Sequence, residues 1–130
     1  MKITPILIVD AIEPSLKFWA DQLGFEKIAE VPDGDKLGFV ILQKDGCEVM
    51  MQTRDSIRRD AGPTAETMLE QGASLYIEVD DFADARNRVQ GAEVLVPERV
   101  AFYGMREIFV RDPGRHVIGF AAKDQGSSGA

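Results

Sequence analysis

The sequence predicts an α+β fold built from two copies of one β-α-β-β-β module, and three observations support this prediction. Strand-like apolar segments and an amphipathic helical segment follow one another in the same order twice along the chain. The pair Val9-Asp10 recurs as Val79-Asp80, at a spacing of 70 residues. Each helical segment ends at a glycine, and the last hairpin of each copy turns at Asp and Gly. Because two copies of one module usually pair their sheets, we expect a curved mixed sheet around a cleft.

The first module spans about residues 2–53. Residues 3–9 form a short β-branched apolar run, which is typical of a strand buried on both faces. Asp10 or Glu13 can cap the helix that follows, and Gly24 ends it. Asp45-Gly46 between two alternating segments is a strong hairpin signal. The expected elements are a strand at 3–9, a helix with Ile12, Leu16, Trp19 and Leu23 on its inner face, and strands at 25–31, 36–43 and 47–53.

Residues 54–73 are polar and predict a connector with a short helix at 65–70. The second module then covers about residues 74–122, so that one domain spans residues 1–122. Pro97 is expected to end a strand, because proline removes a backbone donor. The polar residues 123–130 are expected to form a flexible tail. The expected elements of this module are a strand at 74–79, a helix at 81–89 with Phe82, Ala85 and Val89 inside, closure at Gly91, and strands at 92–96, 105–110 and 116–121.

Composition excludes several classes of function. A net charge of −7 argues against nucleic acid and against an anionic membrane surface, and it favours a cationic small molecule. The single cysteine, Cys47, excludes an internal disulfide and a multi-cysteine metal site, and it fits a reducing cytoplasm. No apolar run approaches the roughly 20 residues of a membrane span. We therefore expect a cytoplasmic protein without nucleic-acid or membrane partners.

Three segments carry a resemblance to a known family. They are residues 16–25 (LKFWADQLGF), 103–107 (YGMRE) and 110–113 (VRDP). Together they resemble the vicinal-oxygen-chelate superfamily of glyoxalases, extradiol dioxygenases, fosfomycin-resistance transferases and bleomycin-resistance proteins, with most similarity to the bleomycin-resistance binding branch. The resemblance implies a glyoxalase-like fold and a homodimer that shares its binding sites at the interface. Pro5 stands where that branch has a proline hinge for exchanging the first strand between subunits.

The resemblance also bears on metal chemistry. Enzymes of this superfamily hold a divalent metal with four residues, typically His, Gln or Glu, one from each of four strands. The matching positions here are Thr4, Met50, Ser74 and Gly119, none of which suits such a metal. We therefore expect no metal, no cofactor and no catalytic residue of that kind. Glu48 is the nearest replacement ligand if the strand register slips by two residues.

A cleft without a metal is expected to bind a small molecule. Strand alternation places Thr4, Ser74, Glu78, Met50 and Gln52 on rows that face the cleft. By the resemblance, Tyr76 and Tyr103 fall where bleomycin binders carry tryptophans that stack on flat heteroaromatic rings. Glu78 and Glu107 are the candidates for pairing a ligand amine, and Arg106 could instead pair either carboxylate. The candidate ligand-binding residues are Tyr76, Tyr103, Met50, Gln52, Glu78, Glu107, Thr4 and Ser74.

Other chemistry-bearing residues are interpreted as structural. Trp19, Phe39, Phe102 and Cys47 are expected to pack in the core, and His116 to satisfy backbone groups beside a turn. The leading hypothesis is a dimeric, metal-free protein that sequesters or carries a flat aromatic or peptide-like antibiotic. One alternative is a metal-dependent glyoxalase- or dioxygenase-type enzyme. Another is a metal-free enzyme that uses Glu48, Glu78 or His116 as acid or base.

Overall fold

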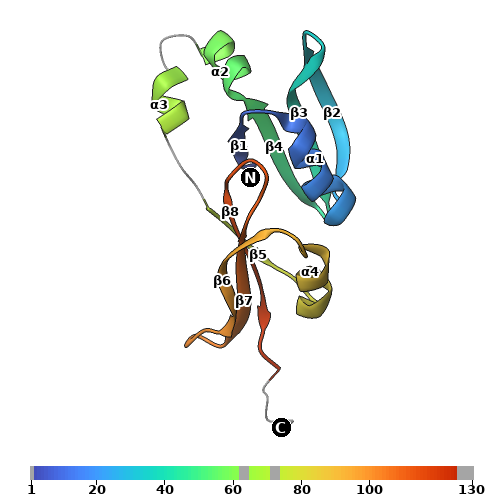
Figure 1. Ribbon diagram of the computed structural model, residues 1–130. Coiled ribbons are helices and arrows are strands. Elements are labelled where there is room, and N and C mark those ends of the chain that lie inside the picture. Colours follow the sequence, from blue (N-terminus) through green and yellow to red (C-terminus); the bar gives the residue numbers. More distant parts are fainter. Residues whose placement is uncertain (1, 62–64, 71–73, 126–130) are drawn as a thin grey trace. The chain divides into compact units, whose positions relative to one another are not determined.

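The structure, a computed structural model, describes residues 2–61, 65–70 and 74–125. It divides into two compact units (Figure 1): unit 1 is Met1–Ala73 with Pro113–Arg115, and unit 2 is Ser74–Asp112 with His116–Ala130. Each unit contains one four-stranded mixed sheet. Within the described residues, no helix is both long and apolar enough to cross a bilayer.

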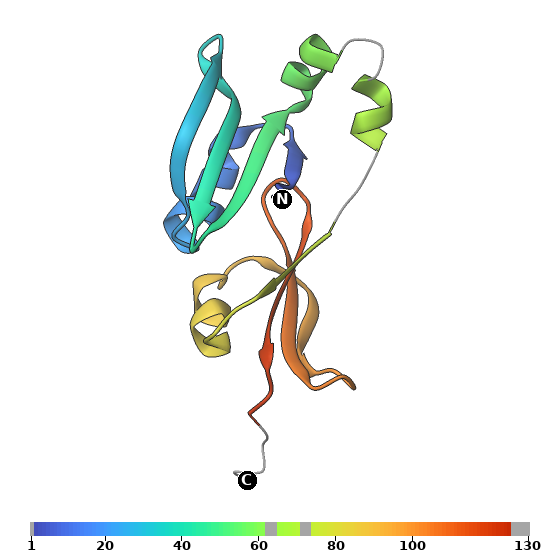
Figure 2. The same cartoon turned by 180° about the vertical axis from the view of Figure 1, so that it is seen from behind.

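Unit 1 has the strand order β1-β4-β3-β2, in which β1 runs parallel to β4 and the other pairs are antiparallel. The helical segment after β1 covers one face of this sheet (Figure 2). The elements are β1 (Ile6–Val9), α1 (Ile12–Leu16), the π-helical turn η1 (Lys17–Gln22), β2 (Glu26–Asp33), β3 (Lys36–Lys44), β4 (Cys47–Thr53), α2 (Arg54–Ala61) and α3 (Ala65–Glu70).

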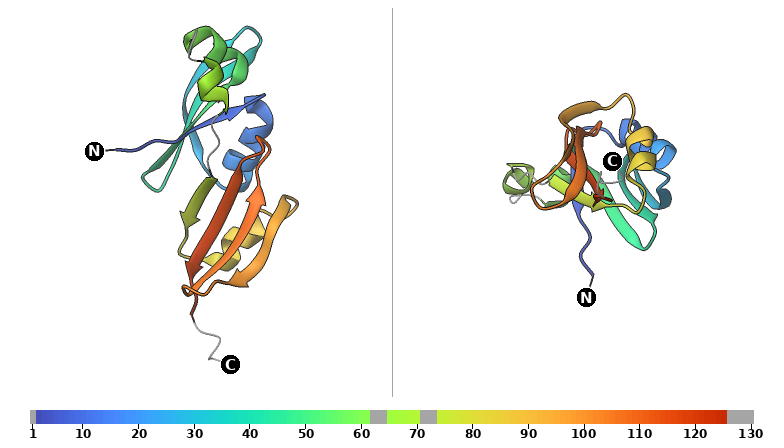
Figure 3. Two further views of the ribbon diagram at one scale, coloured as in Figure 1. Left: turned by 90° about the vertical axis from the view of Figure 1, so that its left-hand side faces the viewer. Right: turned by 90° about the horizontal axis from the view of Figure 1, so that it is seen from below.

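Unit 2 repeats this plan, with the strand order β5-β8-β7-β6 and β5 parallel to β8. One helix covers one face of the sheet (Figure 3). The elements are β5 (Ser74–Glu78), α4 (Phe82–Arg88), β6 (Glu93–Val100), β7 (Met105–Arg111) and β8 (Val117–Lys123). The predicted α+β class with two repeated modules is therefore confirmed.

The core of unit 1 lies between its sheet and the α1–η1 segment. Leu7, Val9 and Met51 point into it from the strands, and Trp19 fills it from the helical side. The prediction that residues 3–9 are buried on both faces is wrong, because β1 begins only at Ile6 and that side chain is half exposed. The sheet has one packed face and one face left for other contacts.

The first helix differs from its prediction in two ways. Neither Asp10 nor Glu13 caps it: Glu13 instead accepts a hydrogen bond from the Leu37 backbone N–H at 2.9 Å. The chain then widens into a π-helical turn, in which the Leu23 N–H donates to the Phe18 carbonyl at 3.0 Å. This wider turn brings both Phe18 and Trp19 into the core, whereas a regular helical period selects Trp19 alone.

Several boundaries also differ from the prediction. The hairpin at Asp45-Gly46 is confirmed, with φ values of +52° and +78°. β6 does not stop before Pro97 but continues to Val100, because Pro97 lies in an edge strand beside an irregularity of the ladder. Residues 54–61 form α2, which was expected to be connector. The helix at 65–70 is confirmed, whereas residues 62–64, 71–73 and 126–130 lie outside the described part of the chain.

Replacing the buried indole tests this packing. Trp19→Ala should lower the free energy of unfolding by about 3–5 kcal/mol, because the Trp19 side chain is fully buried. Urea unfolding of the purified chain measures the change. Phe102→Ala removes a ring that is 100% exposed and should cost less than about 0.5 kcal/mol. Equal losses for the two variants would contradict the packing described here.

Candidate functional site

The sheet face of unit 2 that α4 leaves uncovered brings together aromatic and charged side chains from four segments. Tyr76 on β5 lies opposite Gly119 on β8, and Gly119 lies opposite Phe109 on β7, so the three residues form one row across the sheet. Glu107, two residues before Phe109, points to the same face. The strands thus place predicted site residues beside one another in space.

A β-bulge in β6 decides what lies opposite Glu107. Val96 pairs with Phe109, so a regular ladder would place Glu98 opposite Glu107. The irregularity between Val96 and Arg99 adds one residue, and Arg99 pairs with Glu107 instead. The shift replaces a pair of like charges with an ion pair. Glu98 turns to the other side, where it binds Arg86 and Arg106, each at 2.8 Å.

Glu107 is the centre of this cluster and is fully buried. Its carboxylate accepts hydrogen bonds from the Tyr76 hydroxyl at 2.7 Å and from the Tyr103 hydroxyl, which lies 2.7 and 2.8 Å from its two oxygens. Arg99 donates to Oε1 from Nη2 at 3.0 Å and from Nε at 3.2 Å. Two phenols and one guanidinium therefore compensate the buried charge.

The electrostatics fix the protonation of the cluster. Burial acts to raise the pKa of Glu107, but the hydrogen bonds from Tyr76, Tyr103 and Arg99 outweigh it, and the net effect lowers that pKa. Burial, and then the bond to the Glu107 carboxylate, raise the pKa of Tyr76 well above its usual range. At neutral pH the carboxylate is thus charged and the Tyr76 hydroxyl keeps the proton that it donates.

The rings remain accessible although their hydroxyls are held. Tyr76 is 47% exposed and Tyr103 is 52% exposed. The Phe109 ring lies 6.0 Å from that of Tyr76, centroid to centroid. The expectation that Phe102 is a core residue is wrong, because this side chain is 100% exposed and contacts the Tyr103 ring edge-on at 5.1 Å. Unit 2 therefore presents a preoriented aromatic surface, suited to stacking.

The four positions that the family resemblance relates to metal ligands do not fit a divalent metal. A Cβ at Gly119 would lie 2.5 Å from a Phe109 ring carbon, so the ring occupies the space of any side chain there. Thr4 donates to Glu48 Oε2 at 3.2 Å, and Lys2 holds the same oxygen at 2.6 Å. Met50 offers only a thioether and Ser74 a hydroxyl. Within each unit, the described His, Cys, Asp and Glu side chains form no group of three that could hold a metal.

In unit 1, the uncovered sheet face carries Met50 and Gln52, as the alternation predicted, whereas Met51 turns into the core. The expectation that Cys47 packs in the core is wrong, because Cys47 is exposed. Gln52 lines a pocket of about 400 Å³. Phe39, also expected in the core, lines that pocket instead. The lining residues are Val31, Pro32, Asp33, Gly38, Phe39, Gln52, Ser56, Arg59 and Asp60.

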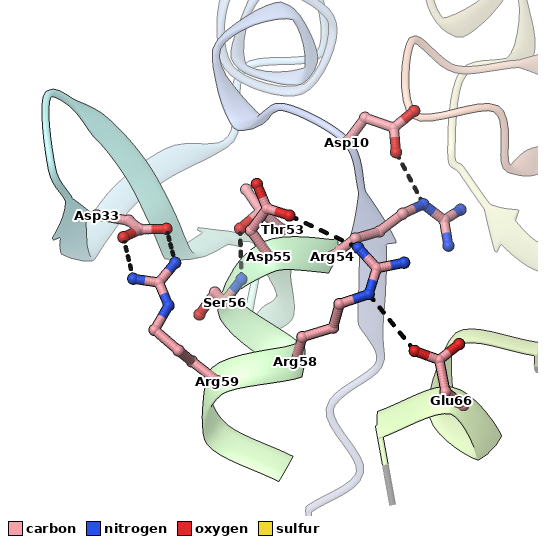
Figure 4. Close-up of polar contacts among 9 residues, drawn as sticks. All are labelled: Asp10, Asp33, Thr53, Arg54, Asp55, Ser56, Arg58, Arg59 and Glu66. Atoms are coloured by element: carbon pink, nitrogen blue, oxygen red, sulfur yellow. Dashed lines mark hydrogen bonds and ion pairs between the residues drawn. The ribbon is translucent and has the colours of Figure 1, made fainter. Parts of the chain in front are cut away.

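Helix α2 forms one wall of this pocket and is fixed to the sheet by polar contacts (Figure 4). The Thr53 hydroxyl accepts from the Ser56 N–H at 3.1 Å, and Arg54 pairs with Asp10 at 2.8 Å. Arg59 directs two guanidinium nitrogens to Asp33 at the end of β2. Sequence reasoning missed this helix, although Thr53 is a good N-cap residue and buried Ile57 follows it by four residues.

The remaining candidates make none of the hydrogen bonds to Glu107 described above and do not line the pocket of unit 1. The sequence suggested that Arg106 could pair with Glu78 or Glu107. In the structure it pairs instead with Glu98 and Asp124. Glu78 and Ser74 are exposed positions of β5. His116 sits beside its turn, where its backbone N–H donates to Asp112 Oδ1 at 2.7 Å and its Nδ1 lies 3.3 Å from that oxygen.

Comparison with known proteins identifies the fold. The family model described as "Glyoxalase/Bleomycin resistance protein/Dioxygenase superfamily" matches residues 2–120. No curated protein matches the sequence at a significant level. A glyoxalase/bleomycin resistance protein/dioxygenase from Nocardioides is 21% identical, with a TM-score of 0.71, over 98% of this chain and 86% of that one.

Two further solved structures represent different activities on the same fold. A lactoylglutathione lyase from Agrobacterium tumefaciens is 17% identical, with a TM-score of 0.69, over 94% of this chain and 92% of that one. A bleomycin-binding protein from bleomycin-producing Streptomyces verticillus, complexed with copper(II)-bleomycin, is 22% identical, with a TM-score of 0.63. The match covers 95% of this chain and 97% of that one. At these identities the likeness establishes the fold alone.

The close approach at position 119 can be tested by adding one methyl group. Gly119→Ala should cost about 1–3 kcal/mol of unfolding free energy, because the Phe109 ring must move. Phe109→Leu in the same chain should recover part of that loss in urea unfolding. A Gly119→Ala variant as stable as the wild type would show that the ring does not occupy this space.

The pH dependence of stability tests the Glu107 cluster. Because the pKa of Glu107 is lowered on folding, its contribution is present above the unfolded value of about 4.3 and is lost as pH falls through the lower folded value. Glu107→Gln should therefore be less stable than the wild type at pH 7, and the difference should shrink in acid. Urea unfolding at pH 7 and pH 3 measures it, with the exposed Glu78→Gln as control. A difference that is equal at both pH values would refute the account.

Proposed function

The chain belongs to the glyoxalase/bleomycin resistance protein/dioxygenase superfamily, and we propose that it is a metal-free member that binds and sequesters a flat aromatic or peptide-like antibiotic. The observation that carries the proposal is the aromatic surface of unit 2, where Glu107 holds the hydroxyls of Tyr76 and Tyr103 and leaves their rings half exposed. This surface suits flat ligands that stack on aromatic rings.

The local chemistry favours binding over metal-dependent catalysis. Solved structures of this fold include both a lyase and an antibiotic-binding protein, so the fold alone does not choose between them. At position 119 the Phe109 ring fills the space that a metal ligand would need. The hydroxyls of Thr4 and Ser74 and the thioether of Met50 are weak donors for a divalent ion. The proposed function therefore involves no metal-dependent reaction.

The proposed mechanism is stoichiometric. A ligand ring gains apolar burial and stacking at Tyr76 and Tyr103, and the fixed hydroxyls reduce the side-chain ordering that binding would otherwise cost. Glu107 acts as a positioning residue rather than as the partner of a ligand amine, because its oxygens already accept from three side chains. Further ligand contacts are proposed in each unit taken by itself: Ser74 and Glu78 on the strand of Tyr76 in unit 2, and Thr4, Met50 and Gln52 in unit 1.

The biological setting is also part of the proposal. Resistance to the bound compound and its transport within the cell both fit a stoichiometric binder. We propose a cytoplasmic homodimer, the assembly that the family resemblance implies, with a small molecule as its other partner. The net charge of −7 makes nucleic acid an unfavourable partner.

A thermal-shift screen of the full, EDTA-treated chain tests this function. The panel contains metal-free bleomycin, other DNA-binding and peptide antibiotics, and divalent metal ions. A ligand at one hundred times its dissociation constant should add about 2.7 kcal/mol of stability, which raises the Tm by several degrees. Tyr76→Ala and Tyr103→Ala should each reduce the shift, whereas Ile28→Ala, which truncates a half-exposed apolar side chain of unit 1, should retain it.

Two results would contradict the proposal. Stabilisation by nickel, zinc, manganese or iron without any response to the antibiotics would indicate a metal enzyme. Binding of an antibiotic that both tyrosine variants leave unchanged would place the site elsewhere. Tyr103→Phe serves as the matched variant, because it keeps the ring and removes only the hydroxyl that Glu107 holds.

A further inference from the structure

We infer that the pocket of unit 1 binds a flat organic cation, such as an aromatic ammonium or amidinium group. The inference deepens the proposed function, because it names a class of ligand for unit 1. It rests on the proposed function in one respect, that the ligands of this protein are small molecules. The pocket measures about 400 Å³ and is lined by β2, β3, β4 and α2 of unit 1. This volume lies within the range of about 300–1,000 Å³ that is usual for small-molecule sites.

Gly38 lines the pocket at a point where the chain has little room for a side chain. A Cβ on Gly38 would lie 2.9 Å from Asp33 Cβ and 3.5 Å from Ser56 Cβ. The first distance is too short for a real Cβ contact, so a side chain at residue 38 would displace Asp33 on β2, whereas the second is an ordinary contact with α2. The Arg59–Asp33 pair then joins these two walls (Figure 4). The resulting cavity is held open by the fold before any ligand enters.

One wall is apolar and can accept a ring. Val31 and Pro32 supply it from β2, and Phe39 supplies an aromatic side chain from β3. Phe39 points to the sheet face opposite the core, next to Gln52 in register. A flat ligand ring can stack against it.

The other wall presents acceptors. Gln52 Nε2 lies 2.9 Å from Ser56 Oγ and 2.9 Å from Asp60 Oδ2. Because a carboxylate only accepts hydrogen bonds, the Gln52 amide must turn its NH₂ group toward Asp60. Both N–H groups are then used, and the Gln52 carbonyl is left as an acceptor. A ligand that donates hydrogen bonds matches this wall.

The charge balance selects a cation over an anion. The lining contains two carboxylates, Asp33 and Asp60, and one guanidinium, Arg59. Arg59 is committed to Asp33 by two nitrogens, which lowers the pKa of that carboxyl. An anionic ligand would have to displace Asp33 from Arg59 and would be repelled by Asp60. A cation instead finds Asp60, which is hydrogen-bonded to the neutral amide of Gln52, while the guanidinium of Arg59 is held at Asp33.

The test uses benzamidinium as the probe and the full chain as the protein. Titration is followed by ¹H–¹⁵N NMR, in which the side-chain amide of Gln52 reports on the pocket. Benzamidinium should shift the Gln52 resonances, whereas benzoate and benzyl alcohol at equal concentration should bind at least about tenfold more weakly. Asp60→Asn should weaken benzamidinium at least about tenfold, which is the smallest effect expected for losing a hydrogen bond to a charged group.

Asp55→Asn is the matched control. It removes a carboxylate from the same helix that does not line the pocket, so benzamidinium binding should stay within about twofold of wild type. Asp60→Asn keeps the size and an acceptor oxygen for Gln52, so that folding is preserved. The ¹H–¹⁵N spectrum of each variant verifies this directly.

Three results would overturn the inference: no shift at Gln52, equal binding of benzoate, or unchanged binding by Asp60→Asn. These outcomes are separate from those of the proposed function. Benzamidinium binding here, with no antibiotic binding that depends on Tyr76 and Tyr103, would overturn the proposed function alone. Antibiotic binding at the tyrosines without benzamidinium at Gln52 would overturn the pocket inference alone.

Discussion

The buried carboxylate of Glu107 is the interaction on which the site of unit 2 depends. An unpaired charge in a protein interior costs several kcal/mol, so the chain must bring donors to it. It does so from three directions, with Tyr76 on β5, Arg99 on β6 and Tyr103 from the loop before β7. The same bonds that satisfy the charge orient two aromatic rings. The hydrogen bonds that compensate the buried charge of Glu107 therefore also fix the rings of the proposed binding surface.

This arrangement depends on an irregular strand. A regular ladder in β6 would place Glu98 opposite Glu107, and the bulge replaces it with Arg99 while sending Glu98 to Arg86 and Arg106. At the neighbouring row, Gly119 leaves room for the Phe109 ring. These local changes set which side chains meet on this face of the sheet, and they leave the pairing of the four strands intact.

Sequence reasoning succeeded where a pattern is local. The repeat, the hairpin at Asp45-Gly46 and the alternation that places Met50 and Gln52 on one face follow from spacing alone. Tyr76, Tyr103 and Glu107 were each predicted as ligand-binding residues. The hydrogen bonds among them were not predictable, because strand pairing and the bulge before Arg99 are long-range features. Helix α2 was missed because its face is mostly charged, and with it the pocket beside Gln52.

The most direct test of this account is a spectrophotometric titration of tyrosine, because the chain contains only two. In the Tyr103→Phe variant, absorbance near 295 nm reports Tyr76 alone, and tryptophan fluorescence verifies that the protein remains folded. The account predicts that Tyr76 ionises well above the ordinary tyrosine pKa, and that adding Glu107→Gln moves this ionisation back toward it. Ionisation of Tyr76 near pH 10 in the folded chain, unchanged by Glu107→Gln, would contradict the central role given to the buried carboxylate.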